Sequence, residues 1–158
     1  MIKFRRSAQN THIKKKKVKY MRVENSFFQN LPLCEFFLSF LTGAVLYYAI
    51  EMLWRGRSHW SMAIVGGVCF YLIYLMYRLF PSMPIVLGCI LGGVIITAVE
   101  LGAGEIVNLR LGWNVWDYSQ IPLNYKGQIC LLFSLFWCLL SFPAIGLAKF
   151  YSNYVFGG

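Results

Sequence analysis

The sequence predicts an all-α membrane protein with four transmembrane helices. Hydrophobic residues make up 58% of the 158 positions and charged residues only 13%, whereas soluble domains have about a quarter of their residues charged. Four apolar segments are each about as long as the 20 residues that a helix needs to cross a bilayer. The Lys and Arg residues gather at one end of the chain. These features exclude a soluble enzyme and a compact nucleic-acid-binding domain.

The N-terminal segment carries almost all of the net charge. Residues 1–30 hold nine of the 15 basic residues and one acidic residue, a net charge of +8, and the rest of the chain contributes +1. Residues 1–25 lack apolar periodicity, so we expect a disordered cytoplasmic tail, followed by a four-helix transmembrane domain over residues 26–158. The tail would hold the N-terminus inside and bind anionic lipid headgroups, rather than nucleic acid. The first apolar stretch begins only near Leu31, so we expect no cleaved signal peptide.

The four expected spans follow from the apolar runs and their breaks. They cover residues 33–54, 61–80, 84–107 and 127–149. Pro81 and Pro84 leave a very short connection between the second and third spans. With both termini in the cytoplasm, eleven basic residues lie inside and four outside, which is the favoured orientation in a cell membrane.

The two outer connections carry aromatic residues where an interfacial belt is expected. Trp54 and Trp60 flank the first connection, and Trp113 and Trp116 lie in the second. The second, over residues 108–126, is the most polar stretch outside the tail. We expect an ordered outer loop there, non-helical around three residues that disfavour helices: Gly112, Pro122 and Asn124.

An internal repeat is a further expectation. Residues 43–51 align with residues 92–100, each starting with Gly and ending with Glu, and residues 66–69 parallel residues 127–130. Two-helix repeats would make the halves parallel, related by a pseudo-twofold axis along the membrane normal. Chance similarity between apolar segments is the alternative.

Carboxylates within the spans need a physical reason, because charge is costly there. At 1.5 Å per residue, Glu51 lies about 22 Å along the first span from Phe36, and Glu100 lies about 24 Å along the third span from Pro84. The two carboxylates therefore reach similar depths. Arg55 follows Glu51 at i+4, which favours an ion pair, and a solute or ion role is the alternative. Glu100 has no local base. It must use Thr97, another helix, water or a ligand, or be protonated.

Small residues predict close helix contacts. Gly88 and Gly92 are four residues apart, a spacing that lets two helices approach closely, and Gly43 is the matching position in the repeat. Gly102 and Gly104 predict either a local break that lines a cavity or fraying at the outer end of the third span.

We expect neither catalysis nor a metal or cofactor. Glu51, Arg55 and His59 faintly resemble an intramembrane metalloprotease motif, but a second histidine motif is missing. There is no Gly-x-Ser-x-Gly sequence. The five cysteines form no Cys-x-x-Cys pair and are expected to be small core residues.

The second half of the chain carries a family resemblance. Glu100, Gly104 and Asn108 precede a run containing Trp116, Asp117, Tyr118 and Ser119, then Asn124, the sequence Gly-Gln-Ile-Cys at 127–130, and Trp137. Over residues 35–145 this pattern resembles the putative ABC-transporter type IV family of CmpB-like small bacterial membrane proteins. The resemblance implies a permease. The chain has no Gly-x-x-x-x-Gly-Lys-[Ser/Thr] loop, so an ABC-type role would need a separate ATPase.

The leading hypothesis is therefore a transporter permease subunit. Its in-membrane polar site would comprise Glu51, Arg55, Thr97 and Glu100. Its outer-loop site would comprise Asn108, Trp116, Asp117, Tyr118, Ser119 and Asn124. The alternative is a non-transporting scaffold or regulator whose glutamates only lock helices together. Side chains fill the middle of a four-helix bundle, so transport predicts a homo-oligomer or a partner membrane subunit.

Overall fold

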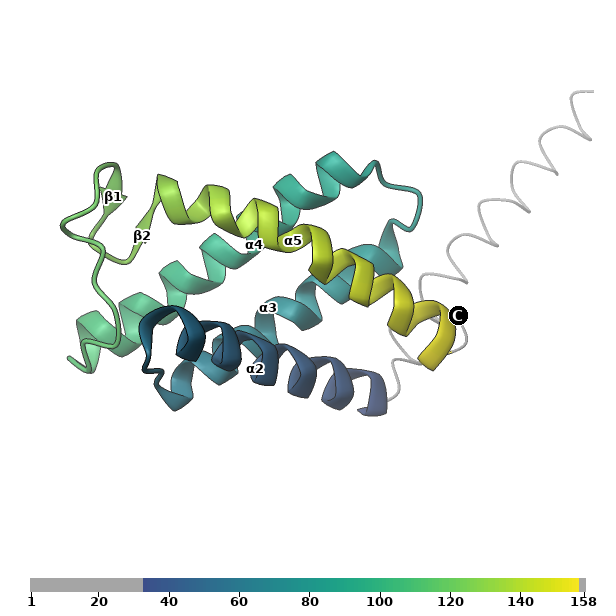
Figure 1. Cartoon of the computed structure of the whole chain (residues 1–158), viewed down its shortest axis with the longest axis horizontal. Helices are drawn as coiled ribbons and strands as arrows, with labels where there is room; N and C mark the ends of the chain where they lie inside the picture. Colours follow the sequence, from purple (N-terminus) through teal and green to yellow (C-terminus); the bar gives the residue numbers. More distant parts are fainter. Residues whose placement is uncertain (1–32, 157–158) are drawn as a thin grey trace, which may run out of the picture. The chain divides into compact units, whose positions relative to one another are not determined.

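A computed structural model describes residues 33–156, and in them the chain forms four long helices (Figure 1). They are α2 (Leu33–Arg55), α3 (Trp60–Leu79), α4 (Ile85–Gly104) and α5 (Leu131–Phe150). Each is long and apolar enough to cross a membrane, so the all-α membrane fold is confirmed. A compact unit begins at Phe36. The expected basic tail over residues 1–25 lies outside the described residues.

The short connections begin and end as the sequence predicts. Gly56 adopts a φ of +66° after α2. The ring Nδ1 of His59 accepts the Ser61 N–H at 3.3 Å and so caps the start of α3. Phe80 ends α3, and α4 begins directly after Pro84, where a proline costs no helical hydrogen bond.

Two helices extend further than expected, through π-helical turns. α4 continues as η1 (Glu105–Arg110), and α5 continues as η2 (Tyr151–Val155). Neither expectation for Gly102 and Gly104 is correct, because the helix neither breaks nor frays there. Gly104 instead lets Gln128 approach closely, since a Cβ at position 104 would lie 2.9 Å from the Gln128 Cβ. Among residues 33–156, no atom lies within 4 Å of the corresponding point on Gly102.

Small residues bring the helices together in two pairs. In the first pair, a Cβ on Gly66 of α3 would collide with the Tyr47 Cβ and would lie 2.7 Å from the Gly43 carbonyl oxygen of α2. In the second pair, a Cβ on Gly92 of α4 would collide with the Ser141 hydroxyl of α5. Gly43 and Gly92 therefore serve close helix contacts within one chain.

Gly88 has a looser neighbour than Gly92 does. A Cβ there would lie 3.0 Å from the Ile145 Cδ1, at the flexible end of a side chain. The contact again joins α4 to α5, so the predicted small-residue face meets another helix of the same chain.

Burial has the pattern of a protein in lipid. Met62, Val65 and Ile73 of α3 form the apolar core together with Ile96 and Ile145. Many large apolar side chains point outward instead, including Leu53, Trp54 and Val86. Several polar side chains are buried between helices: Ser39, Glu51, Glu100 and Ser141. This arrangement keeps polar side chains out of the lipid, between the helices, and presents apolar side chains to the surrounding hydrocarbon.

The predicted repeat is only partly matched by the positions of its residues. Gly43 and Gly92 both lie at close helix contacts, and both Glu51 and Glu100 are buried. The second alignment differs, because Gly66 lies inside α3 whereas Gly127 lies in the turn before α5, with a φ of +68°. The repeat therefore stays a prediction.

The long connection between η1 and α5 is ordered, as expected, and contains a small hairpin. β1 (Asn124–Tyr125) pairs antiparallel with β2 (Ile129–Cys130). Gly112, Pro122 and Asn124 are all non-helical. The prediction was wrong for Asn108, which belongs to η1, because the π turn carries the helix beyond the expected boundary.

The cysteines follow the expectation in part. Cys69 and Cys130 are buried, and Cys89 and Cys138 are half-buried. Cys34 is exposed at the start of α2, which corrects its assignment to the core.

Candidate functional site

The Glu51–Arg55 ion pair is present, as i+4 spacing predicted. Arg55 Nη1 donates to Glu51 Oε1 at 2.6 Å. The Ser58 hydroxyl donates to the other oxygen of Glu51. Arg55 Nη2 donates to the backbone carbonyl of Val115 at 2.9 Å, which ties the end of α2 to the long loop. Glu51 is therefore neutralised by a residue one helical turn away.

Glu100 is held by two other helices. The Tyr47 hydroxyl of α2 donates to its Oε1 at 3.0 Å, and the Trp137 indole N–H of α5 donates to its Oε2 at 2.6 Å. Glu100 is 1% exposed. Within residues 33–156, no basic side chain forms an ion pair with it. The carboxyl group thus sits deep in the bundle with neutral donors on both oxygens.

Thr97 does not hold Glu100, which corrects one of the sequence alternatives. Its hydroxyl donates to Ser134 of α5 at 3.1 Å instead. The alternative of a partner on another helix is the correct one. Sequence reasoning did not assign Tyr47 or Trp137 to this site. The signals were that Tyr47 lies one turn after Gly43 and that Trp137 closes the family-like run.

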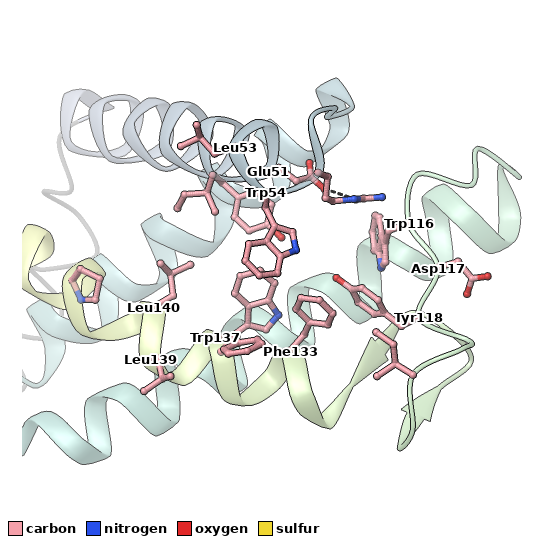
Figure 2. Close-up of a pocket in the computed structure, with 16 residues that line it drawn as sticks. Glu51, Leu53, Trp54, Trp116, Asp117, Tyr118, Phe133, Trp137, Leu139 and Leu140 are labelled. Atoms are coloured by element: carbon pink, nitrogen blue, oxygen red, sulfur yellow. Dashed lines mark hydrogen bonds and ion pairs between the residues drawn. The ribbon is translucent and has the colours of Figure 1, made fainter.

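A cavity of about 780 Å³ lies beside these two glutamates (Figure 2). Its walls come from α2, the long loop and α5. The α2 wall is Tyr47, Ile50, Glu51, Leu53, Trp54 and Arg55. The loop wall is Trp116, Asp117, Tyr118 and Ile121, and the α5 wall is Phe133, Phe136, Trp137, Leu139, Leu140 and Pro143. Most of this lining is apolar or aromatic, as in many small-molecule sites.

The cavity leaves some room within one chain, along part of the bundle only, because its lining on α5 runs from Phe133 to Pro143. Glycine contacts draw α2 onto α3 and α4 onto α5. No described glycine makes such a contact between α2 and α5. These two helices meet through larger side chains instead, at the Tyr47–Trp137 ring pair, and η2, which continues α5, meets α2 at the Thr42–Tyr151 hydrogen bond. The seam between α2 and α5 therefore stays open at its loop end.

Glu100 lies directly behind the cavity wall. Its donors Tyr47 and Trp137 both line the cavity, but Glu100 itself does not. The two rings lie 5.8 Å apart, centroid to centroid. A solute in the cavity would therefore reach the Glu100 carboxyl group only by displacing one of these rings.

Asn108 organises the long loop and does not face the cavity. Its amide nitrogen donates to the Trp116 carbonyl at 2.9 Å and to Gln128 Oε1 at 2.8 Å. Its amide oxygen accepts the Val115 N–H at 2.7 Å. The Trp116 indole N–H donates to the Gln128 carbonyl at 2.9 Å. This buried network fixes the loop wall, on which Trp116 and Tyr118 face the cavity.

Asp117, Ser119 and Asn124 fold the outer part of the loop. Asp117 accepts the Ser119 N–H at 2.8 Å and the Ser119 hydroxyl at 2.9 Å, and its side chain points away from the cavity in Figure 2. Asn124 donates to the Ser119 and Ile121 carbonyls. The hydrogen bonds of these three side chains therefore stabilise turns, which is a common role for Asp, Ser and Asn.

Tyr118 is the loop residue whose polar atom faces the cavity. Its ring stacks on Phe133 of α5 with centroids 4.7 Å apart, and its hydroxyl points into the cavity (Figure 2). No other described side chain or backbone group hydrogen-bonds this hydroxyl. Burial, together with the nearby Glu100 carboxyl, raises the pKa of Tyr118 well above its usual range. The phenol therefore keeps its proton and remains a donor.

Four apolar helices with buried carboxyl groups and an in-membrane cavity define a multi-pass helical membrane protein. The family follows from the sequence comparison. The chain belongs to the family described as putative ABC-transporter type IV, whose model matches residues 18–156. No curated protein and no solved structure matches the chain.

Proposed function

We propose that this protein is the permease subunit of a transporter, with its solute site in the cavity between α2, the long loop and α5. The observation that carries the proposal is the deeply buried Glu100, held by two side chains that also line the cavity. In-membrane ionisable groups are costly and commonly mark solute or proton pathways. The family description supports a transport role.

Glu100 is proposed to couple occupancy of the cavity to a helix movement. A solute that displaces Tyr47 or Trp137 would leave one carboxyl oxygen without its donor. That oxygen would then favour a proton, a cation or a polar group of the solute. Because the two donors belong to α2 and α5, the same displacement would loosen the contact of both helices with α4.

Glu100→Gln tests this proposal in reconstituted liposomes that contain a pH-sensitive dye. Wild-type protein should change the internal pH or the uptake of at least one member of a panel of ions and labelled solutes, and E100Q should abolish that change. Glu105→Gln is the matched control, because Glu105 pairs with Lys126 at the exposed surface and does not line the cavity. Equal activity of E100Q and wild type would refute the proposed role of Glu100.

The proposed assembly follows from the lack of an ATP-binding loop. An ABC-type mechanism would need a separate ATPase, and a homo-oligomer or a partner membrane subunit is the expected context. A neighbouring ATPase gene and co-purification of its product would support this assembly. We propose no enzymatic activity and no bound cofactor, and we expect the lipid bilayer and anionic headgroups to be the contacts of the basic tail.

A non-transporting scaffold or regulator is the second candidate. The hydrogen bonds of Glu100 join α2, α4 and α5, which is also what a purely structural staple would do. In that case, E100Q would lower stability without any transport phenotype separable from folding.

The proposed location is the cell membrane, with both termini in the cytoplasm. Reporter fusions at residues 20 and 158 should read cytoplasmic, and a fusion near Tyr118 should read external. Replacing the four lysines at positions 14–17 with Gln should weaken the orientation and leave the helices intact. A cytoplasmic reading near Tyr118 would overturn this topology.

A further inference from the structure

The open side of the cavity faces the lipid. Leu53 and Trp54 of α2 and Leu139 of α5 line it, and they are 88%, 74% and 70% exposed. All three lie within helices that are long and apolar enough to cross a membrane, so we place the exposed surface of Leu139 in the hydrocarbon and those of Leu53 and Trp54 near the membrane interface, where tryptophan is common. A molecule dissolved in the bilayer could therefore enter between α2 and α5 without crossing the polar loop.

The length of the cavity corresponds to one leaflet. On α5 its lining runs from Phe133 to Pro143, which is about 15 Å at 1.5 Å per residue. The hydrocarbon core of a bilayer is about 30 Å thick. The slot thus extends from the long loop to about the middle of the bilayer, the depth that a lipid chain in that leaflet occupies.

The charged side chains of the lining, Glu51, Arg55 and Asp117, lie at the loop end. Arg55 uses Nη1 for Glu51 and Nη2 for the Val115 carbonyl, so its guanidinium keeps further N–H donors. The Tyr118 hydroxyl is a second donor. Glu51 cancels the charge of Arg55 at 2.6 Å. Asp117 is on the same wall, but its carboxylate bonds Ser119 and points away from the cavity (Figure 2). The groups that face the cavity at its loop end therefore offer hydrogen-bond donors without net charge, beside an apolar and aromatic slot.

We infer that the cavity binds a neutral, single-chain amphiphile from the surrounding leaflet, with its apolar chain between α2 and α5 and its oxygen-bearing head on Arg55 and Tyr118. This inference deepens the proposed function. It rests on that function in one respect only, that the bound amphiphile is the solute that the protein transports. Binding itself requires no transport. It therefore stands or falls separately from the role of Glu100.

The test uses a monoacylglycerol with a diazirine in its acyl chain, added to the purified full-length chain in lipid nanodiscs and cross-linked by light. The labelled peptides, mapped by mass spectrometry, should come from α2 around residues 47–54 and from α5 around residues 133–143. An excess of unlabelled monoacylglycerol should suppress this labelling. The fatty acid with the same chain, ionised above neutral pH, should compete less well, because it brings a charge that the paired Arg55 cannot balance.

Two matched variants separate a specific slot from general contact with lipid. Leu139→Trp should fill the slot and abolish the competable labelling, whereas Leu135→Trp should leave it unchanged. Leu135 is 56% exposed, lies one turn earlier on the same helix and does not line the cavity. Tyr118→Phe keeps the stacked ring and should weaken competition by about threefold to tenfold, the effect of losing one hydrogen bond.

Three outcomes would overturn the inference. The first is labelling that no excess of monoacylglycerol suppresses, which would show ordinary lipid contact. The second is an equal effect of L139W and L135W. The third is the absence of labelling in the slot together with loss of a dimer in L139W, which would show that a second copy of the chain covers this face. None of them bears on whether E100Q abolishes transport.

Discussion

The two buried glutamates lie at similar positions in their helices but are stabilised in different ways. Glu51 obtains its cation from Arg55 on the same helix and its second donor from Ser58 in the adjacent turn. Glu100 obtains both donors from other helices, and neither donor is charged. Glu51 therefore depends on local geometry, and Glu100 depends on the packing of three helices.

This difference separates a structural carboxylate from a responsive one. A neutralised pair at the end of α2 has little reason to change state when the cavity fills. Glu100 loses a donor as soon as Tyr47 or Trp137 moves, and both rings face the cavity. Of the two glutamates, Glu100 is therefore the candidate coupling group. Glu51 neutralises Arg55 at the loop end of the cavity.

The largest expected effect on stability comes from a substitution that separates α4 from α5. Gly92→Leu would drive a side chain into Ser141 and separate Glu100 from Trp137, so we expect a loss of about 3 kcal/mol in the free energy of unfolding, measured by thermal melting in detergent. The Glu51–Arg55 pair would not offset this loss, because both of its residues lie on α2. Gly102→Leu is the control on the same helix, because no atom in the described part of the chain lies within 4 Å of its Cβ position. Similar melting of both variants would contradict the packing of α4 on α5.

A smaller effect is expected when only one donor of Glu100 is lost. Trp137→Phe removes the indole N–H and leaves Oε2 buried without a partner, which should cost about 1–3 kcal/mol. Trp60→Phe is the control, since Trp60 is 59% exposed at the start of α3. If both variants melt at the same temperature, the Trp137 bond does not support the carboxyl group.

Glu100→Gln should change stability by only about 1 kcal/mol. The amide oxygen can accept from Trp137, and the amide nitrogen can donate to the Tyr47 hydroxyl, so both neighbours keep a partner. The measurement is the melting temperature in detergent, read beside the transport assay. A collapsed protein would instead identify Glu100 as a purely structural group and favour the scaffold.

The smallest effect is expected at the local pair. Glu51→Gln keeps an oxygen for Arg55, and the Arg55 side chain is 27% exposed, so water can hydrate the cation that is left. We therefore expect a loss of about 0.5 kcal/mol. Chemical denaturation in mixed micelles measures it. A loss larger than that of Trp137→Phe would reverse the comparison between the two sites.

The sequence predicted the spans and their short connections closely, because each depends on neighbours along the chain. Apolar runs of about the bilayer length set the helices, and Pro81 and Pro84 set the tight connection. It placed the end of the third span less well. A π turn after Gly104 retains Asn108 in the helix, and the packing of Gln128 against Gly104 is a tertiary contact that no local pattern contains.

The sequence by itself determined the class of protein, the four helices and the Glu51–Arg55 pair, since helical geometry brings i and i+4 side chains together wherever they occur. Only the tertiary structure decided the partners of Glu100, the inward role of Asn108 and the cavity. These depend on which helices approach closely. Glycine contacts close the α2–α3 and α4–α5 seams, and the larger rings of Tyr47 and Trp137 keep the α2–α5 seam apart.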